Sequence, residues 1–333
     1  MTFRASITFV CFALGLPPAP SYGQSACVVT PQIFPATTLA QLAEFHYGSI
    51  DYQFAIMLAT NTRVGSGFPF ISDPFRLPQA SSGSMPKLCV PDFNEAEALR
   101  NRYDTYLRAL ADMALAVPAE VSHSLDPIVP GKPAAVATWI RSDQLKRYKT
   151  QSGGWIDTLP SDTWVTEEPH LKEFCTDFAR TSGADPDLLT LRLEQRLGLA
   201  PHSAKTTFVS FTIADPDPAK NIFRPCASPA IDTDTCAVRT AADDDCSSSP
   251  SAQNCEAHNL FFYRQYYSSY GAARPTGFPW TSLGYTFDWA LGPTDGIGHA
   301  TFVRFGESEY VVPQGTPVTI VGAASTADYC GVK

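Results

Sequence analysis

Three acidic residues near the C-terminus have types and spacing that could support catalysis. Asp288 ends an aromatic stretch that begins at Phe278, and Glu307 and Glu309 form a Glu-x-Glu pair before an expected strand. Two carboxyl groups that face one glycosidic bond can act as acid and base, or as acid and nucleophile. A glycan hydrolase is therefore one hypothesis. The alternative for the aromatic stretch is a packed core in which Asp288 accepts hydrogen bonds from backbone amides.

Other catalytic and metal-binding patterns are missing from the sequence. It has no Gly-x-Ser-x-Gly for a serine nucleophile, and His258 and His299 do not have the His-Glu-x-x-His spacing of a zinc site. The acidic run at 243–245 lacks the spaced ligands and the glycine of a calcium loop, so we expect a solvated loop there. We therefore expect no metal and no cofactor.

The Glu-x-Glu pair has a further interpretation, because a strand and a Pro-x-Gly-Thr turn at 313–316 follow it. This arrangement is similar to the end of ADP-ribosyltransferases. The resemblance implies an enzyme that acts on NAD, with Glu309 as the catalytic glutamate that stabilises an oxocarbenium-like centre and Glu307 as its partner. It also implies stand-ins for the Ser-Thr-Ser motif and the nicotinamide-side arginine of that family, namely Thr281 with Ser282, and Arg264 or Arg274.

The elements that must position these residues belong to an α+β domain expected at 134–333, with an antiparallel sheet at its end. Extended patterns predict strands at 134–140, 155–165, 206–213, 301–305, 309–312 and 317–321, and helical spacing predicts helices at 169–179, 186–199 and 256–270. The motifs at 192–199, 223–226 and 277–289 resemble an uncharacterised family of secreted bacterial proteins. That resemblance covers 163–330, and it implies one domain and no activity.

A smaller unit at 24–92 precedes this domain. The stretches at 27–29 and 88–90 predict two short strands, while Thr37 or Thr38 opens one helix and Asp51 opens a second. The expected order is strand, helix, helix, strand.

This unit resembles a LysM module of the bacterial envelope type, on the residues Thr38-Leu39, Leu42-Ala43, Tyr47-Gly48, Tyr52, Ile56, Ala59, Asn61 and Leu88-Cys89-Val90-Pro91. The resemblance implies antiparallel strands with both helices on one face, and a groove that binds peptidoglycan or another N-acetylglucosamine-containing glycan. The groove residues would be Ala36, Thr37, Thr38, Asn61, Thr62 and Arg63. Two loop signatures of the family are replaced here, at 36–37 and by an insertion at 65–86, so a unit that packs against or docks an envelope protein is the alternative.

The sequence contains nine cysteines, of which Cys11 falls within the export signal. The even number that remains indicates disulfides, with 105 pairings open. Zinc is the competing interpretation for the four cysteines from 226 to 255, but they include no Cys-x-x-Cys pair. Because the LysM resemblance makes their strands neighbours, we expect a bond between Cys27 and Cys89, worth about 2–4 kcal/mol. The other expected pairs are Cys226 with Cys236, Cys246 with Cys255, and Cys175 with Cys330.

Residues 1–23 have the basic start, the apolar run and the small residues of a secretory signal. That apolar run is too short for a membrane-spanning helix, and no other segment approaches the required length. We therefore expect an exported chain in the periplasm or outside the cell, with a lipoprotein site at Cys27 as an alternative. The net charge of −9 disfavours nucleic acid as a partner.

The sequence thus predicts a signal peptide at 1–23, a LysM-like domain at 24–92, a helix at 93–116, a linker at 117–133 and a disulfide-stabilised α+β domain at 134–333. The first functional hypothesis is an envelope-associated protein that binds glycan through its LysM-like unit. The second is a secreted enzyme whose C-terminal domain acts on a glycan or on NAD.

Overall fold

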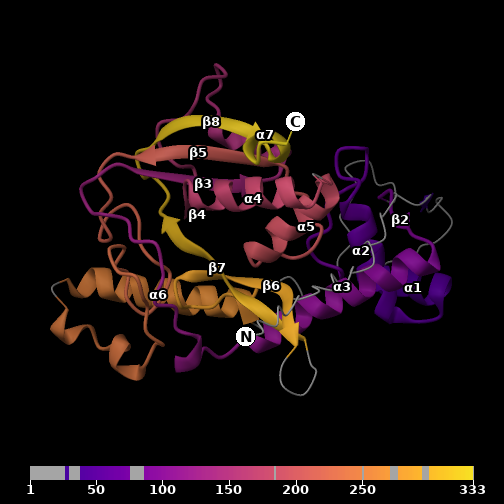
Figure 1. The fold of residues 1–333 in the computed structure, drawn as a ribbon, viewed down its shortest axis with the longest axis horizontal. Helices are drawn as coiled ribbons and strands as arrows, with labels where there is room; N and C mark the ends of the chain where they lie inside the picture. The colour runs from indigo at the N-terminus through magenta and orange to yellow at the C-terminus, as the bar shows by residue number, and fades with distance from the viewer. Residues whose placement is uncertain are drawn as a thin grey trace, which may run out of the picture.

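The computed structural model describes residues 27–29, 38–75, 86–183, 185–249, 251–270, 277–294 and 300–332. The signal at 1–23, Ala36, Thr37, Arg274 and His299 lie outside the described residues. The chain folds as α+β, with a helical N-terminal part beside an antiparallel sheet (Figure 1), so the predicted fold class is confirmed at this level. Among the helices that the structure describes, none has the length and apolar character needed to cross a membrane.

Six strands form the main sheet in the order β6-β7-β4-β3-β5-β8, and every neighbouring pair is antiparallel. Their bounds are β3 Ala134–Ile140, β4 Thr163–Glu167, β5 Thr207–Ile213, β6 Tyr285–Thr294, β7 Ala300–Val312 and β8 Thr319–Ser325. β7 is continuous where two strands are expected, because Ser308 pairs with Tyr285 across the polar stretch that separates them in the sequence pattern.

The sheet divides between β3 and β4. Along its whole length β3 pairs with β5, whereas β3 and β4 share only two pairs, Val136 with Glu167 and Ala137 with Thr166. Beyond these pairs the strands diverge, and Figure 1 shows β3, β5 and β8 stacked together at one end while β7 and β6 run away from them. A gap therefore opens in the middle of the sheet.

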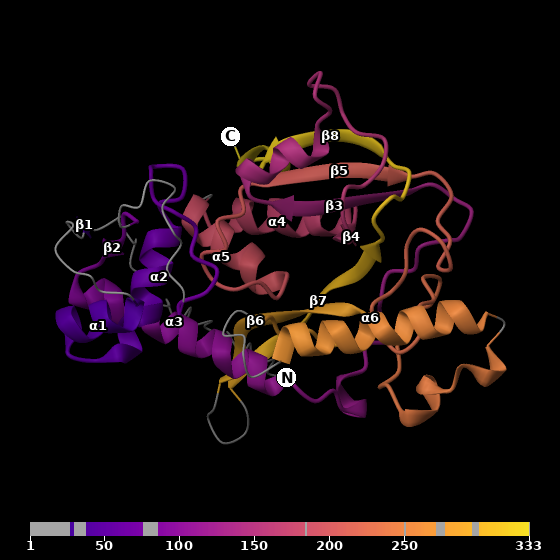
Figure 2. The same cartoon turned by 180° about the vertical axis from the view of Figure 1, so that it is seen from behind.

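Helices α4 (His170–Thr181) and α5 (Pro186–Arg196) cover one face of the sheet, where Leu171 and Leu193 pack against Trp139 and Phe208. The opposite face buries a second apolar cluster around Val136, Phe211, Tyr310 and Val312. Helix α6 (Ala252–Tyr270) lies alongside β6 and β7 (Figure 2), and α7 (Thr326–Tyr329) follows β8. Short 3₁₀ helices complete the chain at Ile50–Tyr52, Pro118–Glu120, Ser142–Tyr148, Ala241–Asp244 and Cys246–Ser248.

The N-terminal part has the predicted order of strand, helix, helix, strand. β1 (Val28–Val29) pairs antiparallel with β2 (Cys89–Val90), with α1 (Leu39–Tyr47) and α2 (Gln53–Asn61) between them. Gly48 ends α1 at a φ of 72°, a backbone conformation that favours glycine. Whether this unit belongs with LysM modules stays a prediction.

Helix α3 (Phe93–Asp112) joins the two parts through a common core. Its Tyr106 is buried, donates to the carbonyl of Gly277 at 2.7 Å and meets the ring of Trp289 on β6 edge to face at 5.6 Å. Phe287 and Trp289 belong to the same apolar cluster as α1 and α2. The N-terminal unit is therefore packed onto the sheet.

Residues 117–133, expected as a linker, join α3 to β3 but are packed rather than free in solvent. Leu125 and Ile128 are buried, and their backbone N–H groups donate to the carbonyls of Asp234 and Ile231 at 2.8 Å each. A composition rich in Pro, Ser and Gly predicts irregular backbone, but it does not predict whether the segment is exposed to solvent.

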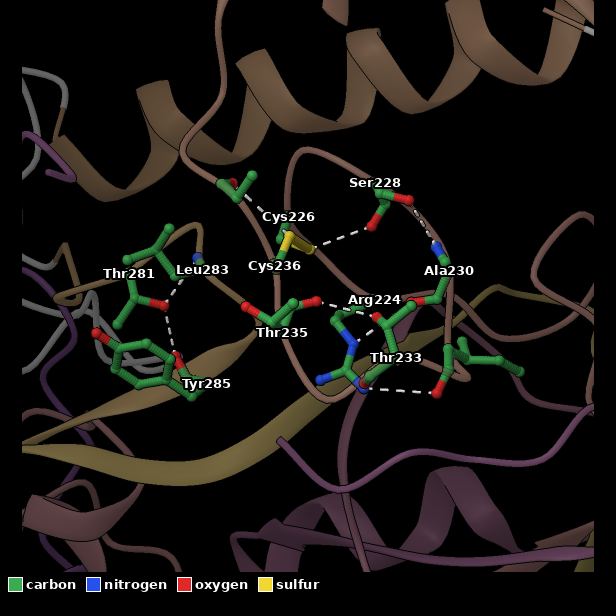
Figure 3. Close-up of a disulfide and its surroundings, with 12 residues drawn as sticks. Arg224, Cys226, Ser228, Ala230, Thr233, Thr235, Cys236, Thr281, Leu283 and Tyr285 are labelled. Carbon is green, nitrogen blue, oxygen red and sulfur yellow. Dashed lines mark hydrogen bonds between the residues drawn. A yellow bond between two sulfur atoms is a disulfide. The ribbon is translucent and has the colours of Figure 1, made fainter. Parts of the chain in front are cut away.

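The eight described cysteines form four disulfides, which supports an exported protein. They join Cys27 to Cys89, Cys175 to Cys330, Cys226 to Cys236 and Cys246 to Cys255, the pairs expected from the sequence. Figure 3 shows the Cys226–Cys236 bond beside buried Arg224, whose guanidinium donates to the carbonyl of Thr233 at 2.9 Å. This bond fixes the loop that surrounds the arginine.

Candidate functional site

The structure brings two of the three predicted acidic residues, Asp288 and Glu307, together, and each forms an ion pair with arginine. Asp288 is fully buried and accepts two hydrogen bonds from Arg192, at 2.9 and 2.6 Å. Arg196, one turn further along α5, lies 3.8 Å from Asp288 and donates to Glu307 at 2.6 Å. Both guanidinium groups also stack on the ring of Phe174. Ion pairs of this kind neutralise the carboxylates and hold α5 on the sheet.

Glu309 lies apart from this network. It pairs in register with Thr166 on β4, so both side chains lie on the face of the sheet that α4 and α5 cover. Glu309 is 6 % exposed, and its Oε1 atom makes no hydrogen bond with a described residue. Burial raises the pKa of this carboxyl to about 8 and outweighs the opposing charge of Arg224. A buried carboxyl with a strongly shifted pKa marks a candidate functional group.

The gap between β3 and β4 forms a cavity of about 350 Å³ in front of Glu309. Its walls come from both diverging strands, from the turn that follows α5 and from the loop before β5, and include Trp139, Trp164, Thr166, Leu199, Lys205 and Glu309. The hydroxyl of Thr166, like Glu309 Oε1, is buried without a hydrogen-bond partner in the described part of the chain. A mostly apolar cavity of this size with a few convergent polar groups suits a small-molecule ligand.

Lys205 supplies a positive group at the margin of this cavity. Its ammonium donates to the carbonyl of Trp139 at 2.6 Å. Carbonyls of successive strand residues point in opposite directions, and that of Ile140 accepts from Thr206 on the β5 side, so that of Trp139 points toward the gap. Burial lowers the pKa of Lys205 to about 8.

The stand-ins that the sequence suggests for the hydroxyl motif and the arginine lie elsewhere. Thr281 donates to the carbonyl of Tyr285 at 2.6 Å and accepts from the N–H of Leu283, which closes the turn before β6 (Figure 3). Arg264 is exposed on α6. The hydroxyl beside Glu309 belongs to Thr166, and sequence reasoning missed it because the register between β4 and β7 is a long-range property.

The described residues of the expected glycan groove are mostly engaged in local hydrogen bonds. Thr38 caps α1 by accepting from the N–H of Gln41 at 3.2 Å. Asn61 is buried and bonds both backbone groups of Ile71, while Thr62 donates to the carbonyl of Ala59. Asn61, Thr62 and Arg63 also line a cavity of about 300 Å³ between the N-terminal unit and α5.

The remaining polar groups named from the sequence have structural partners. His258 bonds the carbonyl of Cys226 at 2.8 Å. In the acidic run, Asp244 accepts from Arg239 at 2.7 Å and from Tyr263 at 2.6 Å, so this loop is pinned to α6. Within the described ranges, no group of three or more His, Cys, Asp or Glu side chains is placed to hold a metal ion.

Comparison with known proteins assigns no function to the candidate site. No family model matches the chain, and neither the curated proteins nor the solved structures include a match.

Proposed function

We propose that the α+β part is an enzyme that uses NAD as a substrate, with Glu309 as the carboxylate that faces the reacting ribose. The observation that carries this proposal is the burial of Glu309, without a hydrogen-bonded cation among the described residues, in the cavity at the divided sheet. In this reaction the bond between ribose C1′ and nicotinamide breaks, and the ADP-ribosyl group passes to an acceptor.

Charge favours this substrate over a neutral glycan. The pyridinium of NAD is positive, and positive charge develops on the ribose as the bond breaks. A carboxyl whose pKa stands near 8 in the empty cavity becomes ionised when such a cation binds beside it, because an opposite charge favours the ionised form. Glu309 would then stabilise the transition state electrostatically. Lys205, at the cavity margin, suits the negative pyrophosphate.

A glycan hydrolase with two carboxylates fits these contacts less well. That mechanism needs one free acid and one free carboxylate on either side of the bond. Asp288 and Glu307 are each bonded to arginine, and Glu309 is the acidic residue named from the sequence that faces the cavity.

The test is nicotinamide release from NAD by the oxidised, signal-free chain. We expect turnover by the wild type and a loss of about 100-fold or more in Glu309→Gln, since the amide cannot carry the charge. Glu44→Gln, the same change at an exposed position of α1, should keep the wild-type rate. Absence of turnover by the wild type, or full activity in Glu309→Gln, would reject the proposal.

A second role, glycan binding by the N-terminal unit, is favoured by the pairing of β1 with β2 around two helices and by the Cys27–Cys89 bond. Its test is cosedimentation of the full mature chain with insoluble peptidoglycan. We expect the wild type to sediment, Arg63→Glu to sediment less, and Arg108→Glu, on the exposed side of α3, to match the wild type. If the wild type stays in solution, the unit serves as a packing element.

A further inference from the structure

A separate cavity of about 560 Å³ lies at the open edge of β7. β4 ends at Glu167 and its last pair with β7 is Thr166 with Glu309, so among the described residues no strand pairs with the edge of β7 from 305 to 308 on that side. The cavity forms there, between this edge, residues 121–126 and the first turns of α4.

His170, the first residue of α4, lines this cavity, and a contact with Asp126 orients its ring. Its Nδ1 atom lies 2.9 Å from a carboxylate oxygen of Asp126. The backbone of Asp126 is itself held, because its N–H donates to the hydroxyl of Ser308 at 2.7 Å and its carbonyl accepts from Arg224 and Tyr310. With Nδ1 bonded to the carboxylate, Nε2 is the ring nitrogen left to accept a proton.

The two cavities are neighbours along β7. Glu309 faces the cavity in the divided sheet and Glu307 lines the cavity at the open edge. Two residues along one strand span about 7 Å. Thr286 separates the cavities: it lines the first and donates to the carbonyl of Arg196, which lines the second. A ribose held at Glu309 is therefore within reach of a small group bound beside Glu307.

We infer that the cavity at the open edge of β7 binds the acceptor, and that His170, oriented by Asp126, is the general base that deprotonates an acceptor hydroxyl. This inference rests on the proposed cleavage of NAD. The C1′–N bond breaks and its electron pair leaves with nicotinamide. A C1′–O bond forms to the acceptor oxygen, and the proton of that hydroxyl passes to Nε2 of His170.

The charges around the cavity disfavour an anionic acceptor. The groups facing His170 are Asp126 on the preceding segment, Glu167 at the end of β4, and the ion pair of Glu307 with Arg196 across the cavity. Glu307 is balanced by Arg196, whereas Asp126 keeps its negative charge beside a neutral His170, so the walls repel an anionic acceptor. An alcohol or water meets hydroxyl, imidazole and aromatic groups, and imidazole assistance contributes about 10²–10⁴-fold in such steps.

The experiment measures nicotinamide release from NAD, with water or added methanol as the acceptor. His170→Ala should lower both hydrolysis and methanol transfer by about 100-fold with an unchanged KM for NAD, and added imidazole should restore part of the rate. Asp126→Asn should lower the rate less, by about tenfold. The control is His46→Ala, at an exposed histidine of α1, which should match the wild type.

The outcomes separate this inference from the proposed function. If the wild type does not cleave NAD, both are rejected. If cleavage depends on Glu309 while His170→Ala keeps the wild-type rate, only the acceptor base is rejected. A loss in His170→Ala that imidazole does not restore, together with a lower melting temperature, indicates a structural histidine and also rejects the base.

Discussion

Asp288 and Glu309 are acidic side chains buried on the same sheet, yet their surroundings differ. Asp288 accepts two hydrogen bonds from Arg192, whereas one oxygen of Glu309 has no hydrogen-bond partner among the described residues. Burial of a charge is tolerated when it is paired and costs free energy when it is not. Burial alone therefore does not mark a functional carboxyl. The presence or absence of a paired cation distinguishes a structural acid from a candidate catalytic one.

The end of α5 explains why the two acids differ. Arg192 and Arg196 lie one turn apart on the helix and reach Asp288 and Glu307. The helix then ends, and Gly198 continues the chain at a φ of 64°, where a Cβ atom would lie 3.3 Å from the carbonyl oxygen of Phe287. Because α5 ends at Arg196, it carries no third arginine one turn further on that could pair with Glu309, and the cavity in front of Glu309 stays open.

The largest expected effect is a stability difference between matched substitutions. Asp288→Asn should destabilise the fold by about 3 kcal/mol, because it leaves the partly buried Arg192 without its counter-ion, whereas Arg196 keeps Glu307. Glu309→Gln should be neutral or stabilising, because it removes a buried acid of which one oxygen, Oε1, has no hydrogen-bond partner among the described residues. Urea unfolding at pH 7.5 measures both, and equal losses in the two variants would make Glu309 a structural residue like Asp288.

The pH dependence of stability should show a smaller effect at the same position. The folded pKa of Glu309, about 8, exceeds the value of 4.5 for a free glutamate, so the folded state holds a proton that the unfolded chain releases. Its contribution is fully present below about pH 4.5 and is lost as the pH rises through 8. Between pH 6 and 8 the wild type should therefore lose on the order of 2 kcal/mol more than Glu309→Gln.

Thermal melts of the wild type and Glu309→Gln across this pH range measure how the stability of each protein depends on pH. Burial also raises the pKa of Glu194, to about 7, and because that residue is present in both proteins its contribution cancels in the comparison. Parallel pH profiles for the two proteins would show that Glu309 does not titrate between the folded and unfolded states.

Residue type and local spacing predicted much of the fold. The strands at 134–140 and 206–213 and the helices near 170–180 and 186–196 follow from apolar periodicity, and the α+β class follows from their order. Strand β6 was not predicted, although Tyr285 to Trp289 alternates aromatic with polar residues as a strand does, because the aromatic content of the stretch indicated a packed core first. The short β4 was predicted too long, because Trp155 and Thr158 make only isolated bridges.

The candidate site was predicted only in part. Glu309 stood out from its spacing with Glu307, but the features that separate it from Asp288 are contacts between distant segments. The arginines of α5, the register of Thr166 with Glu309 and the loss of pairing between β3 and β4 all depend on tertiary packing. The sequence determines these contacts, but no local pattern of residues predicts them.

The smallest expected effect concerns Thr166, the hydroxyl next to Glu309. Thr166→Val replaces a buried hydroxyl, which has no partner in the described residues, with a methyl group of similar size. Because no hydrogen bond is lost, stability should change by less than about 1 kcal/mol. If the hydroxyl orients the substrate, nicotinamide release should fall about tenfold, while Thr176→Val on the exposed side of α4 changes neither quantity. A Thr166→Val protein with wild-type turnover would show that this hydroxyl does not orient the substrate.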